Sequence, residues 1–159
     1  MRTAVILRTL VFTSFMFLFS CTKDDIAELE IINAVSDTQL ETQVITLINE
    51  HRTVIGMSTL AFNSIAYSEA NTHNDYMIAK GILSHDNFNS RASKIFSEAN
   101  ANQIGENIAK GPLTSNAVFE GWIRSTDHKA NIEGDFTHTA ISVKKDGNGT
   151  TYYTQIFFK

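Results

Sequence analysis

The sequence has 159 residues, of which 43% are hydrophobic and 19% are charged, and its formal net charge is −4. This size and composition indicate one compact domain and exclude an intrinsically disordered chain. The acidic balance, without any basic run, argues against a nucleic-acid-binding surface, so we expect no nucleic acid among the partners.

Residues 1–20 have the pattern of a secretory signal, because Arg2 and Arg8 accompany an apolar run that is too short to favour a membrane-spanning helix. The run ends in Leu18-Phe19-Ser20-Cys21, which resembles the lipobox of bacterial lipoproteins. The resemblance implies cleavage before Cys21, acylation of that residue and attachment to a lipid membrane. An ordinary signal peptide followed by an unrelated cysteine is the alternative. Cys21 is the only cysteine, which excludes an intramolecular disulfide.

The segment after the signal predicts a tether and then a domain. We expect residues 21–37 to form the lipidated cysteine and tether, and residues 38–159 to fold. Lys23-Asp24-Asp25 resembles the acidic signals that send some lipoproteins to the outer leaflet, and the start of a solvated tether explains it equally well. The implied location is the bacterial cell envelope, at the outer membrane or its surface.

Helical periodicity dominates the first part of this domain. The first helix should begin at a capping box formed by Thr38 and Glu41 and end near Gly56. The others are expected at residues 63–81, 90–99 and from Thr114 or Ser115 through Ile123, with one further turn capped by Asp127.

Strand signals come late in the chain. Residues 103–109 have a short strand pattern, and residues 139–143 and 152–158 flank Asp146-Gly147-Asn148-Gly149, a strong hairpin signal. Helices first and strands later favour the α+β class.

Four polar motifs interrupt the apolar sequence of the second half. They are Ser84-His85, Gly105-Glu106-Asn107-Ile108-Ala109, Trp122 with His128 and Asn131, and Phe136-Thr137-His138. Imidazole and carboxylate groups gathered in one cleft can bind a metal or transfer a proton, so these motifs predict a shared functional cleft.

Together with Asn49-Glu50-His51-Arg52, these motifs resemble the CAP domain family of cysteine-rich secretory, antigen 5 and pathogenesis-related proteins. The likeness is to its bacterial, cysteine-free branch, and it extends from about Leu40 to Phe158. It implies a three-layer α-β-α sandwich with a small, largely antiparallel central sheet. It also implies a cleft lined by His85, Glu106, His128 and His138.

Many members of this family hold two histidines and two glutamates in the cleft, and several of them bind a divalent metal there. Carried over, the resemblance makes His85, Glu106 and His138 candidate zinc ligands. Ser125 stands where the second glutamate is expected, so the set is incomplete. The alternative is a hydrogen-bonded His–Glu cluster that orders the cleft without metal.

Other residues in these motifs have structural interpretations. Trp122 and His73 follow apolar helical stripes and are expected in the core, and Asn107 is expected to bind backbone groups. His51 is expected to be solvated or paired. His128 either lines the cleft or caps its short helix.

Three functional hypotheses follow. The first is an envelope lipoprotein that binds a small lipid, peptide or glycan in the cleft without strong catalysis, because no nucleophile accompanies the histidines. The second is a metal-dependent hydrolase of a peptide or envelope polymer, with Glu106 as base or ligand. The third is a surface adhesion module with a purely structural cleft. No catalytic residue is assigned.

Overall fold

The computed structural model describes residues 34–159. In this range the chain forms five helices and four strands in a mixed order. These elements are α1 (Thr38–Val54), β1 (Ala61–Phe62), α2 (Ser64–Lys80), α3 (Phe88–Glu98), β2 (Ile104–Lys110), α4 (Ser115–Arg124), α5 (Thr126–Ile132), β3 (His138–Lys145) and β4 (Thr151–Phe158).

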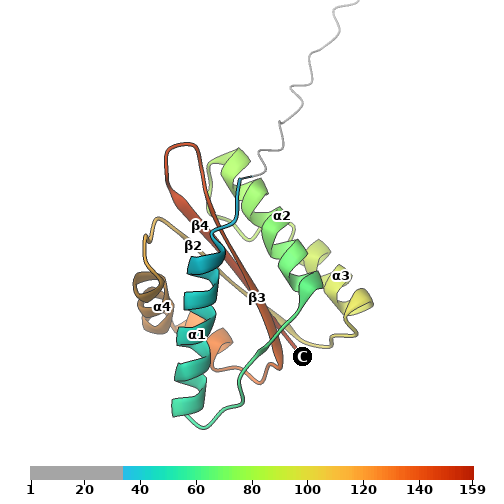
Figure 1. The fold of residues 1–159 in the computed structure, drawn as a ribbon. Helices are drawn as coiled ribbons and strands as arrows, with labels where there is room; N and C mark the ends of the chain where they lie inside the picture. The colour runs from blue at the N-terminus through green and yellow to red at the C-terminus, as the bar shows by residue number, and fades with distance from the viewer. Residues whose placement is uncertain (1–33) are drawn as a thin grey trace, which may run out of the picture.

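The elements form three layers, with one sheet in the middle and helices on both of its faces (Figure 1). The strand order is β1-β3-β4-β2, in which β4 is antiparallel to both neighbours and β1 is parallel to β3. Helices α2 and α3 cover one face of the sheet, and α1, α4 and α5 cover the other. The predicted α+β sandwich with a small, largely antiparallel sheet is therefore confirmed.

The central strand β4 supplies the core on both faces, because its side chains alternate between them. Tyr153 and Phe157 pack with the α1 and α4 side chains, whereas Ile156 and Phe158 pack with those of α2 and α3. The expected β3–β4 hairpin is present, and Asp146 closes its turn by accepting backbone N–H bonds.

Two helix caps differ from the predicted ones, and α3 begins at Phe88 rather than at residue 90. Asp37, not Thr38, caps α1 by accepting from the backbone N–H of Leu40, and the Glu41 carboxylate instead accepts from the N–H of Val143 at 2.9 Å. The predicted capping box is therefore wrong. Helix α5 begins at Thr126 after an N-cap at Ser125, so the expected cap at Asp127 is also wrong.

Contacts with the folded body begin before residue 38. Ser36, which the sequence assigned to the tether, pairs with Lys144 on β3 and donates a hydrogen bond to Asn71 on α2. The predicted signal segment and the acylated Cys21 lie outside the described residues. Within residues 34–159, no helix combines the length and apolarity needed to cross a membrane.

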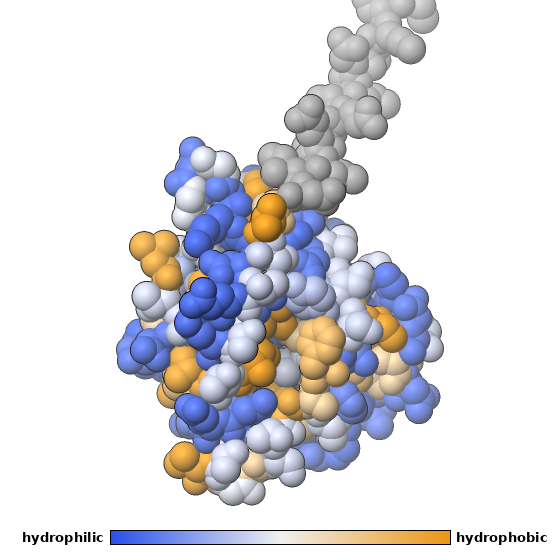
Figure 2. All heavy atoms as spheres, viewed as in Figure 1, coloured by the Kyte–Doolittle hydropathy of each residue, from blue (hydrophilic) through white to orange (hydrophobic). Residues whose placement is uncertain are grey.

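The surface beside α1 is hollowed. A groove of about 260 Å³ there is lined by apolar side chains that include Ile45, Phe62 and Ile141. Figure 2 shows apolar side chains reaching the surface on this face of the molecule. None of the four predicted cleft residues lines this groove.

Candidate functional site at the β2 edge

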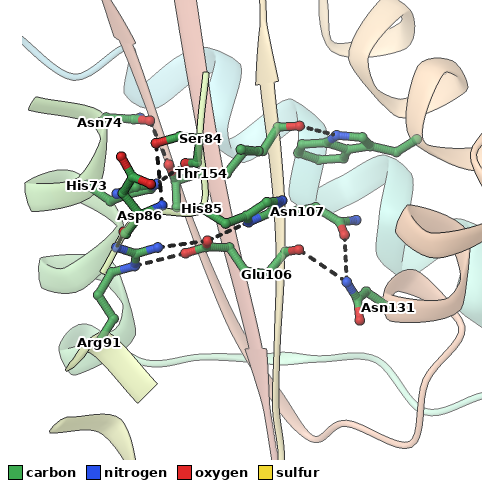
Figure 3. Close-up of polar contacts among 12 residues, drawn as sticks. His73, Asn74, Ser84, His85, Asp86, Arg91, Glu106, Asn107, Asn131 and Thr154 are labelled. Atoms are coloured by element: carbon green, nitrogen blue, oxygen red, sulfur yellow. Dashed lines mark hydrogen bonds and ion pairs between the residues drawn. The ribbon is translucent and has the colours of Figure 1, made fainter. Parts of the chain in front are cut away.

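Glu106 is the centre of the polar cluster at β2, which is an edge strand of the sheet. Arg91 grips its carboxylate with two hydrogen bonds, from Nε to Oε2 at 2.9 Å and from Nη2 to Oε1 at 2.8 Å. His85 Nδ1 binds the same Oε1 at 2.8 Å (Figure 3). The Glu106 side chain is only 2% exposed, so this carboxylate is a buried and fully partnered anion.

Arg91 is a functional neighbour that the sequence analysis missed. It lies on the buried face of α3 with Ala92 and Ile95, and its Nη1 donates to the carbonyl oxygen of Asp86 at 2.6 Å. A buried carboxylate needs a cation or several hydrogen-bond donors, and this requirement is the signal from which a nearby basic residue could have been predicted. Arg91 thus neutralises Glu106 and fixes the loop that carries His85.

His85 presents an oriented imidazole. A carboxylate oxygen only accepts, so Nδ1 of His85 donates to Glu106, and the neutral ring keeps its lone pair on Nε2. The His85 side chain is 52% exposed, in contrast with the buried Glu106. In Figure 3 the ring extends from Glu106 across β2 toward the side of Asn107 and Asn131.

The loop before His85 is held from α2. The buried His73 donates from Nε2 to the carbonyl oxygen of Ser84 at 2.7 Å, and its ring stacks on Tyr76. Burial lowers the pKa of His73, and the charge of Arg91 lowers it further. The hydroxyl of Tyr76 donates to Asp86 at 2.8 Å. His73 is thus the core histidine that the sequence predicted.

On the other side of β2, side chains from α4 and α5 bind the strand. Asn131 donates to the carbonyl oxygen of Glu106 at 3.2 Å and to Oδ1 of Asn107 at 2.8 Å. Trp122 Nε1 donates to the carbonyl oxygen of Ile108 at 3.2 Å. These bonds occupy outward-facing carbonyls of the edge strand, which discourages another chain from pairing with it. Asn107 and Trp122 are structural, as expected.

His128 lies on α5 near His85. Its ring packs against Trp122 at a centroid distance of 6.4 Å, and its backbone carbonyl accepts from Asn107 at 3.0 Å. Burial lowers the pKa of His128, and repulsion from a protonated His85 lowers it further. The two imidazoles therefore share one electrostatic neighbourhood, and the lining of a cleft by His128 stays a prediction.

Glycine is required at position 105. A Cβ there would lie 2.5 Å from Oδ1 and 3.0 Å from Cγ of Asn131, and 3.2 Å from Cζ of Phe136. The absence of a side chain lets α5 approach β2 closely enough for the Asn131 hydrogen bonds.

His138 is elsewhere. It opens β3 opposite Ala61 of β1 and Phe158 of β4, and β4 separates it from β2. Two strand spacings amount to roughly 10 Å, before any displacement along the strands is added. His138 Nδ1 bonds the hydroxyl of Thr137 at 2.8 Å, and the ring stacks on Phe158 at 5.0 Å. Its contacts are those of a residue that stabilises the sheet.

The predicted zinc ligands do not come together. Among residues 34–159 there is no group of three His, Cys, Asp or Glu side chains placed to hold a metal ion. The Glu106 carboxylate is already bound by the Arg91 cation, which would repel a metal cation. The residues present therefore do not fit a zinc centre, and they match the alternative of a hydrogen-bonded His–Glu cluster.

Arg52 connects this region to the rest of the sheet. It is 1% exposed, and its guanidinium donates to the carbonyl oxygens of Ser58, Ile132, Gly134 and Phe136 at 2.7–3.2 Å. These carbonyls belong to the segment after α1 and to the end of α5 and the turn into β3. Arg52 thereby positions α5, and with it His128, against the sheet.

The fold and these motifs are those of a secreted-type domain family. Residues 45–157 match the cysteine-rich secretory protein family (CAP), and the chain belongs to that family.

The chain is similar to several bacterial proteins. An uncharacterized membrane protein of Bacillus subtilis, YlbC, is 30% identical over 126 residues, which are 77% of this chain but only 35% of the relative. An outer surface protein of Borrelia burgdorferi has a TM-score of 0.70 at 18% identity, covering 79% of this chain and 98% of that one. An extracellular SCP-domain protein of Bacillus anthracis has a TM-score of 0.67 at 24% identity, covering 77% and 41%. At these identities the solved structures establish the fold alone.

Proposed function

We propose that this CAP-family protein is an envelope-attached ligand-binding protein, in which the imidazoles of His85 and His128 at the β2 edge contact a small ligand. The observation that supports it is the state of Glu106. Both of its oxygens are bound by Arg91 and His85, whereas the rest of the His85 ring faces solvent. The Glu106 carboxylate orients the His85 ring, and the exposed part of that ring is available to contact the ligand.

Attachment to the envelope rests on the lipobox-like sequence that ends at Cys21. The names of the similar proteins, a membrane protein, an outer surface protein and an extracellular protein, support this location. Cys21→Ala should release the protein from the membrane fraction of bacteria that express it. Unchanged partitioning of the variant would contradict lipid anchoring.

The binding role is tested on the purified full chain in detergent. Lipid, peptide and glycan panels should yield a ligand whose affinity falls at least tenfold in His85→Ala and in His128→Ala. His138→Ala is the matched control, because this histidine lies across the sheet, and its affinity should be unchanged. Equal loss in all three variants, or loss in none, would refute the assignment. Ligand binding that survives His85→Ala would favour an adhesion surface elsewhere.

The competing hypothesis is a metal-dependent hydrolase that uses His85, Glu106 and His138. It requires the Arg91–Glu106 pair to open and His138 to approach across β4, and the structure offers no support for either step. Elemental analysis of the purified protein separates the two proposals. Stoichiometric zinc together with chelator-sensitive hydrolysis would restore the hydrolase, whereas our proposal predicts neither.

A further inference from the structure

A second cavity lies between α2 and the start of α3, beside Arg91. It has a volume of about 250 Å³, and α2 contributes Glu69, Thr72, His73 and Tyr76 to its wall. These residues recur every three or four positions, so they form one face of the helix. The start of α3 closes the other side with Asn87, Ser90 and Arg91.

The charges around this cavity already have partners. Arg91 is neutralised by Glu106, and Oε1 of Glu69 accepts from Lys94 at 2.6 Å. A charged ligand would lose hydration here without gaining an unpaired counter-charge. The cavity therefore favours a neutral ligand.

The remaining polar groups that line the cavity are uncharged and can form hydrogen bonds with a ligand. His73 is 2% exposed, and because its Nε2 donates to Ser84, the neutral ring directs a lone pair from Nδ1. In the part of the chain that the structure describes, Nδ1 makes no hydrogen bond. The Asn87 side chain makes no capping bond to α3, and the Ser90 hydroxyl also lines the cavity. The Thr72 hydroxyl donates to the carbonyl oxygen of Ser68 at 3.0 Å, so toward a ligand it can accept.

We infer that this α2–α3 cavity binds a neutral polyhydroxylated ligand, a single sugar ring. Sugar hydroxyls both donate and accept, so they can donate to His73 Nδ1 and to the Thr72 oxygen and accept from the Ser90 hydroxyl and the Asn87 amide. Tyr76 adds an aromatic surface with a polar edge, which suits a ring that is apolar on its faces. The volume equals that of about eight liquid waters, below the range of drug-sized pockets, and therefore suits one ring rather than a chain.

The cavity adjoins the His85 region without sharing its ligand-facing groups. Arg91 lines the cavity and also binds Glu106, and His73 holds the carbonyl of Ser84 directly before His85. A ligand in the cavity would thus contact residues that orient His85. Sugar binding in the cavity does not depend on the function proposed for His85 and His128.

The test is nuclear magnetic resonance titration of the full chain in detergent with glucose, mannose and N-acetylglucosamine. At least one sugar should produce saturable shifts of the Thr72, Tyr76 and Ser90 amides. The double variant Thr72→Val/Ser90→Ala should weaken that affinity at least fivefold. Ser93→Ala, on the same helix as Ser90 but outside the cavity lining, is the matched control and should bind as the parent does.

The absence of saturable shifts at these three amides with every sugar would overturn the inference, as would undiminished affinity in the double variant. Sugar shifts confined to His85 and His128 would also overturn it while leaving the proposed function intact. Cavity binding that persists in His85→Ala would support the inference even if the proposed function failed.

Discussion

Glu106 on β2 and His138 on β3, toward opposite sides of the sheet, have different surroundings. At the β2 edge, Glu106 is 2% exposed and is held by a cation and an imidazole, so the cluster is tight, buried and electrostatically closed. On the β1 side, at the start of β3, His138 has one hydroxyl partner and an aromatic neighbour, and no carboxylate is bonded to it in the described chain. Motifs of one family can therefore lie on one sheet and still serve different purposes.

The difference has a physical origin in the buried carboxylate. A buried anion is stable only with complementary charge and hydrogen bonds, so Glu106 dictates the positions of Arg91 and His85. His138 imposes no such demand, because its Nδ1 bonds the hydroxyl of the adjacent Thr137 and its ring stacks on Phe158. The carboxylate defines the site, and the histidines are not equivalent.

The largest effect should come from Arg52, which links α5 and the turn into β3 to α1. Arg52→Leu leaves the carbonyl oxygens of Ser58, Ile132 and Phe136 without a donor, whereas that of Gly134 still accepts from the N–H of Phe136. Unpaired buried groups cost about 1–3 kcal/mol each, so we expect a loss above about 4 kcal/mol. Urea unfolding followed by circular dichroism measures it. Arg124→Ala, an exposed arginine, should stay within about 0.5 kcal/mol. Similar losses in both variants would contradict the linking role.

The next effect is at the β2 edge itself. Glu106→Gln leaves the buried Arg91 without its anion, and breaking such a pair costs about 3–5 kcal/mol. The double variant Glu106→Gln/Arg91→Met should recover part of that loss, because no charge is then left unpaired. Chemical denaturation of the two variants decides the matter. No recovery in the double variant would show that the pair is not the source of the cost.

Gly105→Ala tests the close approach of α5 to β2. The new Cβ would displace the Asn131 side chain and its two hydrogen bonds, so we expect a loss of about 1–3 kcal/mol. In an Asn131→Ala background the same change should cost less, because most of the clash is gone. An additive double-mutant cycle would contradict the contact.

Acid should weaken the fold through His73. Burial lowers the pKa of His73 in the folded state, so the unfolded chain takes up the proton first as the pH falls below about 6.5. Its contribution to stability is complete above that pH and is lost on acidification down to the folded-state pKa. Melting temperatures recorded from about pH 7.5 to 5 should fall less steeply in His73→Gln than in the parent. Equal slopes would refute this source of acid sensitivity.

The smallest effect on stability should come from His138, on the β1 side of the sheet. His138→Phe keeps the aromatic contact with Phe158 and loses one exposed hydrogen bond, so the change should stay within about 1 kcal/mol. Thermal melts and the ligand assay should both resemble the parent. A large loss of ligand affinity would place His138 in the binding site with His85 and would contradict the contrast between His138 and Glu106.

The sequence was sufficient for the architecture, because periodicity and motif order each have a local cause. Helices α1, α2 and α4 and the β3–β4 hairpin lie close to their expected positions. Strand β1 was missed because two residues, Ala61 and Phe62, carry no period that can be recognised.

The site was harder to predict, because it depends on register and side-chain partners. Which strand lies between His138 and Glu106 follows from the β1-β3-β4-β2 order, which no local pattern encodes. The motifs drew attention to histidines, whereas Arg91, which belongs to no motif, holds the carboxylate. Pairing across α3 and β2 is a tertiary fact.

The central claim is that Glu106 orients His85 so that Nε2 meets the ligand. The most direct test is a long-range proton–nitrogen correlation spectrum of the imidazoles in the full chain, with Glu106→Gln as the comparison. The structure predicts that neutral His85 carries its proton on Nδ1 in the parent and loses this preference in Glu106→Gln. A proton on Nε2 in the parent, or joint shifts of His85 and His138 on adding zinc, would contradict it.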